Sequence, residues 1–105
     1  MNAKDVLFKT DRFNLSEVKP HFINPCCFGE DLAAWMKAKL IERNALVRQE
    51  PAQEDWGWHF RAQYQGARYW LGFGGNSDGD ATDPNRGEWR VFVNKERSFL
   101  ERLTG

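Results

Sequence analysis

Residues 54–75 read EDWGWHFRAQYQGARYWLGFGG, and no other stretch of the chain combines alternating apolar residues, dense aromatics and a turn signal. With the two-residue period of a β-strand, one face of its first half carries Trp56, Trp58, Phe60, Ala62 and Tyr64. The pair Gln65-Gly66 follows, and its glycine tolerates the positive φ that a tight hairpin turn requires. The segment therefore predicts a β-hairpin.

The apolar residues also predict how the two strands of this hairpin align. If Gln65 and Gly66 are the loop residues, every apolar side chain of the first strand faces an apolar side chain of the second. The predicted pairs are Tyr64 with Ala67, Ala62 with Tyr69, Phe60 with Leu71 and Trp58 with Phe73. A shift by one residue would place Trp58 and Phe60 against polar or glycine positions, so this register is favoured.

The remaining elements are read from weaker patterns. Glu30 and Asp31 after Gly29 suit a helix N-terminus, and apolar residues recur at helical spacing from there to near Asn44. Asn94 is expected to cap a second, final helix that turns Phe99, Leu100 and Leu103 inward. Short strands are expected at residues 6–13, 21–24, 45–47 and 88–93, with a polar connection at 48–55 and an exposed loop at 76–87.

Together these elements predict an α+β fold. We expect a two-layer sandwich in which an antiparallel sheet of three to five strands carries two helices on the Trp58 and Phe60 face, and a ferredoxin-like arrangement is one form of it. The chain has 105 residues, which suits one domain spanning residues 1–105 with one modest core.

Composition restricts the class of protein and of partner. Acidic and basic side chains balance at 15 each, so the basic excess that nucleic-acid binding requires is missing. The opening residues, MNAKDVLFKTD, carry charges throughout and predict neither a secretory signal nor a membrane span. We therefore expect a cytoplasmic protein that binds neither nucleic acid nor membrane, and no pattern indicates a cofactor.

The second face of the hairpin is the candidate binding site. The register places Arg61 opposite Trp70, where a cation–π contact is expected, and His59 opposite a glycine. The candidate binding residues are His59, Arg61, Arg68, Trp70, Arg90 and Phe92. Arginine beside exposed aromatics is typical of interface hot spots. The other interpretation is a solvated sheet face whose Trp70 is covered by the N-terminal segment.

These residues favour a non-enzymatic binding or regulatory protein, because they assemble no nucleophile, base and orienting group. The first expected partner is another protein, with a second copy of this chain as its simplest form. The second is a small anionic ligand held by the arginines.

The alternative is a cysteine-dependent or metal-binding protein centred on Cys26 and Cys27. Both precede the expected helix, whose dipole lowers the pKa of a nearby thiol, and zinc ligation with His21 and His59 is a further variant. Two small buried hydrophobic side chains are the simpler interpretation. Because neighbouring cysteines close no loop between distant segments, no disulfide framework is expected.

Overall fold

In the computed structural model, which describes residues 3–96, the hairpin has the predicted register. Strand β3 (Gly57–Tyr64) pairs antiparallel with β4 (Ala67–Ser77), and all four predicted apolar pairs are present. Gln65 and Gly66 adopt φ angles of 49° and 79°, the left-handed conformation that a two-residue hairpin loop requires. Local alternation and turn chemistry thus account for the centre of the sheet.

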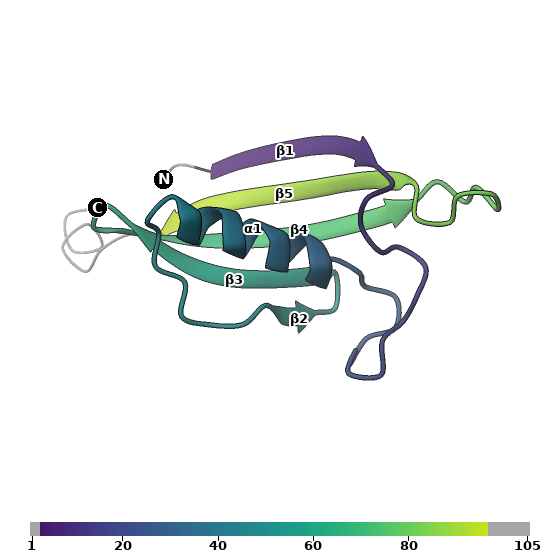
Figure 1. Cartoon of the computed structure of the whole chain (residues 1–105), viewed down its shortest axis with the longest axis horizontal. Coiled ribbons are helices and arrows are strands. Elements are labelled where there is room, and N and C mark those ends of the chain that lie inside the picture. Colours follow the sequence, from purple (N-terminus) through teal and green to yellow (C-terminus); the bar gives the residue numbers. More distant parts are fainter. Residues whose placement is uncertain (1–2, 97–105) are drawn as a thin grey trace.

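Three further strands extend the hairpin into a five-stranded antiparallel sheet in the order β1-β5-β4-β3-β2 (Figure 1). On one side, β5 (Gly87–Glu96) pairs with β4, and β1 (Ala3–Thr10) forms the edge next to β5. On the other side, the short β2 (Ala52–Glu54) forms the edge next to β3. The strand count lies within the predicted range, and the edge strand expected at residues 6–13 begins earlier, at Ala3.

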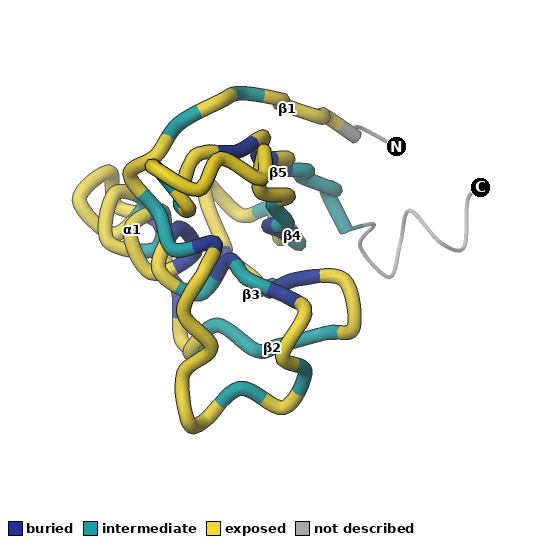
Figure 2. The backbone as a smooth tube through the Cα atoms, turned by 90° about the vertical axis from the view of Figure 1, so that its right-hand side faces the viewer, coloured by how far each residue is buried: buried dark blue, intermediate teal, exposed yellow. Residues whose placement is uncertain are grey.

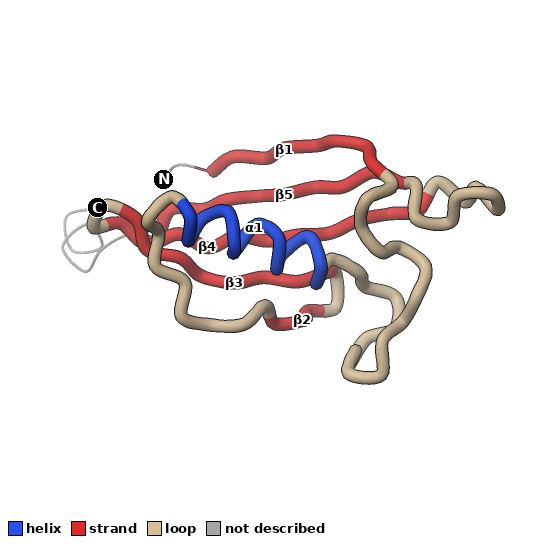
Figure 3. The backbone as a smooth tube through the Cα atoms, in the orientation of Figure 1, coloured by secondary structure: helices blue, strands red, loops and turns tan. Residues whose placement is uncertain are grey.

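One helix covers one face of this sheet. Helix α1 (Glu30–Glu42) begins and ends close to the predicted bounds, and it contacts β3 and β4 (Figures 1 and 3). Gly29 precedes it with a φ of 139°. In residues 3–96 no helix is both long enough and apolar enough to span a membrane.

The predicted two-helix sandwich is wrong, and with it the ferredoxin-like arrangement. Residues 3–96 contain a single helix, and Asn94 lies inside β5 instead of capping a second one. The strand continues because Asn94 has strand neighbours on both sides, Ala3 in β1 and Trp70 in β4, so its backbone belongs to the sheet. Phe99, Leu100 and Leu103 lie outside the described residues.

Two short predicted strands also differ from the structure. Residues 21–24 form a loop, because the Gln53 side chain satisfies their backbone groups in place of a neighbouring strand. Its amide oxygen accepts hydrogen bonds from the backbone N–H groups of Ile23 and Asn24, and its amide nitrogen donates to the Asn24 carbonyl oxygen. Residues 45–47 make only an isolated bridge between Leu46 and Gln63.

The core lies between α1 and the sheet (Figure 2). Its largest fully buried side chains are Trp89, Phe60, Phe73 and Leu32. Trp58 is 3% exposed, as its predicted position on the core face requires. Trp56 was expected on the same face but is 41% exposed. Since Glu54 pairs with Gly57, Trp56 lies in the turn between β2 and β3 and leaves the alternation of the strand.

Candidate binding face

The sheet face opposite α1, which we call the open face, gathers large aromatic side chains. Trp56, Trp70 and Phe92 form a triangle whose ring centroids lie 5.7 Å (Trp56–Trp70), 5.1 Å (Trp56–Phe92) and 5.3 Å (Trp70–Phe92) apart. His59 stacks on Trp70 at 5.4 Å. The structure therefore brings together three of the candidate residues, His59, Trp70 and Phe92, and adds Trp56.

Glycine makes room for this cluster. Gly72 lies beneath the Phe92 ring, and a Cβ atom at Gly72 would lie 2.4 Å from the Phe92 Cζ atom. Any side chain there would displace the ring, so this glycine serves aromatic packing. Gly74 and Gly75, further along β4, are half-buried and line a groove beside the rings.

This aromatic groove has a volume of about 750 Å³, within the range of ordinary ligand sites. Trp56, Trp70 and Phe92 line it together with glycines of β4. The polar side chains in its lining are Glu54, Asn76, Glu88, Arg90 and Asn94, and Leu7 adds an apolar edge. The groove thus combines aromatic surface with hydrogen-bonding groups, as binding sites do.

Arg90 already contacts two residues of the open face. Its Nε and one terminal nitrogen donate to the two carboxylate oxygens of Asp5, at 2.9 Å and 3.1 Å. This hydrogen bonding lowers the pKa of Asp5 below its ordinary value. The guanidinium also lies 4.9 Å from the centroid of the Phe92 ring. Arg90 therefore supports the aromatic cluster and has a carboxylate partner.

The charge left around the groove is negative. Glu88 forms no ion pair with any residue between 3 and 96, and the Glu54 Oε1 atom lies 3.2 Å from the His59 Nδ1 atom. The two atoms lie at the distance of an ion pair, but without the geometry of a hydrogen bond. The Glu54 carboxylate and the His59 ring therefore form an ion pair only when His59 is protonated. Lys9 of β1 is the cross-strand neighbour of Glu88, so with a neutral imidazole Asp5, Glu54 and Glu88 against Lys9 and Arg90 leave one negative charge.

The other end of the open face carries a second, smaller hollow of about 270 Å³. We call it the basic hollow, and its charged residues are Arg48, Arg61, Arg68 and Glu96. The Arg61 Nε atom donates to Glu96 at 2.7 Å, so Arg61 pairs with that carboxylate and not with Trp70 as expected. The remaining two candidate residues, Arg61 and Arg68, thus lie away from the groove. Three arginines against one glutamate leave two positive charges.

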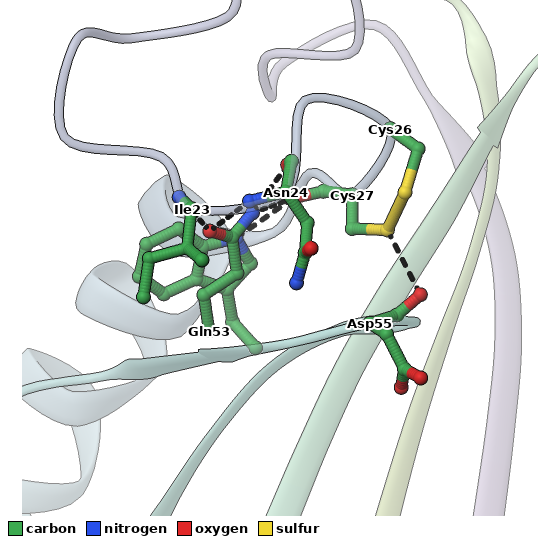
Figure 4. Close-up of a disulfide and its surroundings, with 7 residues drawn as sticks. Ile23, Asn24, Cys26, Cys27, Gln53 and Asp55 are labelled. Carbon is green, nitrogen blue, oxygen red and sulfur yellow. Dashed lines mark hydrogen bonds between the residues drawn. A yellow bond between two sulfur atoms is a disulfide. The ribbon is translucent and has the colours of Figure 1, made fainter.

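The cysteines form a separate feature in front of α1. Cys26 and Cys27 are joined by a disulfide between neighbouring residues, although no disulfide framework was expected (Figure 4). Cys26 is exposed and Cys27 is buried, so the interpretation as two buried hydrophobic side chains holds only for Cys27. Among residues 3–96, no three His, Cys, Asp or Glu side chains lie close enough together to hold a metal ion.

Several contacts hold Cys27 in place. Its carbonyl oxygen accepts hydrogen bonds from the Trp58 Nε1 and Gln53 Nε2 atoms, both at 3.0 Å. Its Sγ atom lies 3.1 Å from the Asp55 carbonyl oxygen (Figure 4). A disulfide sulfur carries no proton, so this last contact is packing. The backbone around Cys27 therefore remains anchored whether or not the disulfide is intact.

Reduction of the disulfide should lower the free energy of unfolding by only about 1 kcal/mol, because the bond closes the shortest loop a chain can form. Urea unfolding followed by tryptophan fluorescence, with and without a phosphine reductant, measures this difference. A Cys26→Ser, Cys27→Ala double variant is the control and should not respond to the reductant. A loss of more than about 3 kcal/mol would show that the bond does hold separate segments together.

No protein-family model matches the chain, and neither a curated protein nor a solved structure shows significant similarity to it.

Proposed function

We propose that this chain is a non-enzymatic binding protein whose open face takes a protein partner, in the simplest form a second copy of the chain. The supporting observation is the cluster of Trp56, Trp70 and Phe92 around a groove on the sheet face opposite α1. Aromatic residues are enriched at protein interfaces, where they contribute large contact areas at a small loss of side-chain entropy. Pairing would bury this surface from water.

The charges of the aromatic groove favour a protein partner there over a small anionic ligand. Arg61 and Arg90 already have the carboxylates of Glu96 and Asp5 as partners, so an anion would have to compete with both. The aromatic groove has surplus negative charge, which repels an anion. The disulfide between Cys26 and Cys27 leaves no free thiol in residues 3–96 to act directly as a nucleophile.

Sedimentation velocity tests the proposal. Wild type should associate reversibly to a dimer in the micromolar range, and a Trp56→Ala, Trp70→Ala double variant should be monomeric at the same concentrations, because it lacks two of the three rings. Loss of central aromatic residues commonly weakens an interface by 2 kcal/mol or more each, about thirtyfold in dissociation constant.

Trp35→Ala is the matched control for this experiment. Trp35 is 40% exposed, almost as much as Trp56, but it lies on α1 on the other side of the sheet. Its removal should leave the association unchanged, and circular dichroism should show that all variants remain folded. Wild type that stays monomeric to about 500 μM, or a dimer that survives the double substitution, would contradict the proposal.

A further inference from the structure

The disulfide in front of α1 joins an exposed residue to a buried one. Cys26 is exposed, whereas Cys27 is only 6% exposed. Cys26 lies at the corner of a tight turn that the Cys27 N–H group closes by donating to the Asn24 carbonyl oxygen at 3.3 Å. Pro25 occupies the second position of this turn, where proline is favoured. A thiol that arrives from solvent therefore meets Cys26 first.

The turn is held by hydrogen bonds that do not involve sulfur. The Gln53 Nε2 atom donates to the carbonyl oxygens of Asn24 and Cys27, at 2.7 Å and 3.0 Å. The Trp58 Nε1 atom donates to the same Cys27 oxygen at 3.0 Å. A disulfide between neighbouring residues adds little to this, because it closes so short a loop. The folded chain can therefore hold the bond between the two sulfur atoms open or closed.

Asp55 provides an acceptor for the sulfur that would be released. Its carbonyl oxygen lies 3.1 Å from the Cys27 Sγ atom (Figure 4). Once Cys27 is a thiol, its S–H group can donate to that oxygen. A hydrogen bond to the neutral form disfavours the charged form, so Cys27 stays protonated. Closing the disulfide again requires a Cys27 thiolate, and an adduct on Cys26 therefore persists.

We propose that Cys26 is a modification site for low-molecular-weight thiols, which exchange with the Cys26–Cys27 disulfide. The incoming thiolate forms a new disulfide with the Cys26 Sγ atom. The old bond breaks, its electron pair goes to the Cys27 Sγ atom, and that sulfur takes a proton from water. No further oxidant or reductant is needed, because one disulfide replaces another. Exposed disulfides are typically the labile or regulatory ones.

This site is independent of the proposed function. Cys26 and Cys27 line neither the aromatic groove nor the basic hollow of the open face. A wild type that sediments as a monomer would therefore remove the proposed homodimer without affecting the exchange at Cys26.

Exchange with reduced glutathione, a representative low-molecular-weight thiol, tests the site. Wild type that carries the disulfide is mixed with glutathione and stopped with acid at intervals, and its free thiols are then blocked. Tandem mass spectrometry maps the adduct. The first adduct should lie on Cys26 at least about tenfold more often than on Cys27. Circular dichroism of the modified protein should match that of the unmodified protein, because the turn does not depend on the disulfide.

The unfolded chain is the matched control, because it has the same two cysteines without the turn. In urea that unfolds the protein, adducts on Cys26 and Cys27 should form within about twofold of each other. The preference for Cys26 should thus depend on the fold and not on the local sequence.

Two single variants test the cysteines separately with oxidised glutathione. Cys27→Ala leaves the exposed Cys26 thiol, and Cys26→Ser leaves the buried Cys27 thiol beside the Asp55 carbonyl oxygen. The Cys27→Ala variant should form a mixed disulfide at least about tenfold faster than the Cys26→Ser variant. Circular dichroism establishes that both variants are folded.

Four results would overturn the proposal. The first two are equal labelling of the two cysteines in the folded protein and a preference for Cys27. The third is an exchange rate that increases with urea in parallel with global unfolding. The fourth is isolated protein with two free thiols that do not join on oxidation.

Discussion

Replacing Trp58 with alanine should lower the free energy of unfolding by about 3–5 kcal/mol, a large part of the stability of a domain this small. Trp58 is 3% exposed and packs against Phe22, with the ring centroids 5.2 Å apart. Its indole nitrogen also donates to the Cys27 carbonyl oxygen at 3.0 Å. The substitution therefore opens a cavity in the core and takes one hydrogen-bond donor from a part-buried loop.

Urea unfolding, followed by circular dichroism, measures this loss at a concentration at which wild type and variant have the same oligomeric state. Trp35→Ala is the control, because Trp35 is 40% exposed and its removal should cost no more than about 1 kcal/mol. A Trp58→Ala variant whose free energy of unfolding lay within about 1 kcal/mol of wild type would show that Trp58 does not lie in the core.

The second large effect is expected from Gly57→Ala, which should lower the free energy of unfolding by about 3 kcal/mol. A Cβ atom at Gly57 would lie 2.1 Å from the Phe73 carbonyl oxygen and 3.2 Å from the Gly74 Cα atom. Both are backbone atoms of the neighbouring strand, so no side-chain rotation relieves the overlap. The strands must move apart next to the Trp58–Phe73 pair, where the sheet meets the core.

Gly66→Ala separates this overlap from the ordinary effect of replacing a glycine. A Cβ atom at Gly66 meets nothing within 4 Å. The substitution is therefore opposed only by the strain of a positive φ of 79°, which should lower the free energy of unfolding by about 1 kcal/mol. Denaturant midpoints of the two variants, measured side by side, give the comparison. Equal midpoints would mean that β3 and β4 do not approach as closely at Gly57 as the structure shows.

The sequence by itself determined the features that depend on neighbours along the chain. The register of β3 and β4 follows from two alternating runs joined by a two-residue loop, because a shift would move the whole apolar set to the wrong face. Helix α1 follows from acidic residues at its start and apolar residues at helical spacing. The same register placed His59 and Trp70 on one face of the hairpin, so part of the candidate face was predictable.

Tertiary structure decided that Trp56 joins the open face and which residues pair with its charges. Trp56 has the alternation of a core residue, and it reaches the open face only because β2, unrecognised in a polar segment, pairs with β3 and turns the chain at that residue. Asp5 pairs with Arg90 across 85 positions, and Arg61 with Glu96 across 35. A periodic pattern describes one strand at a time, so it cannot show which distant carboxylate neutralises an arginine. The opposite charges of the two hollows arise only when the strands come together.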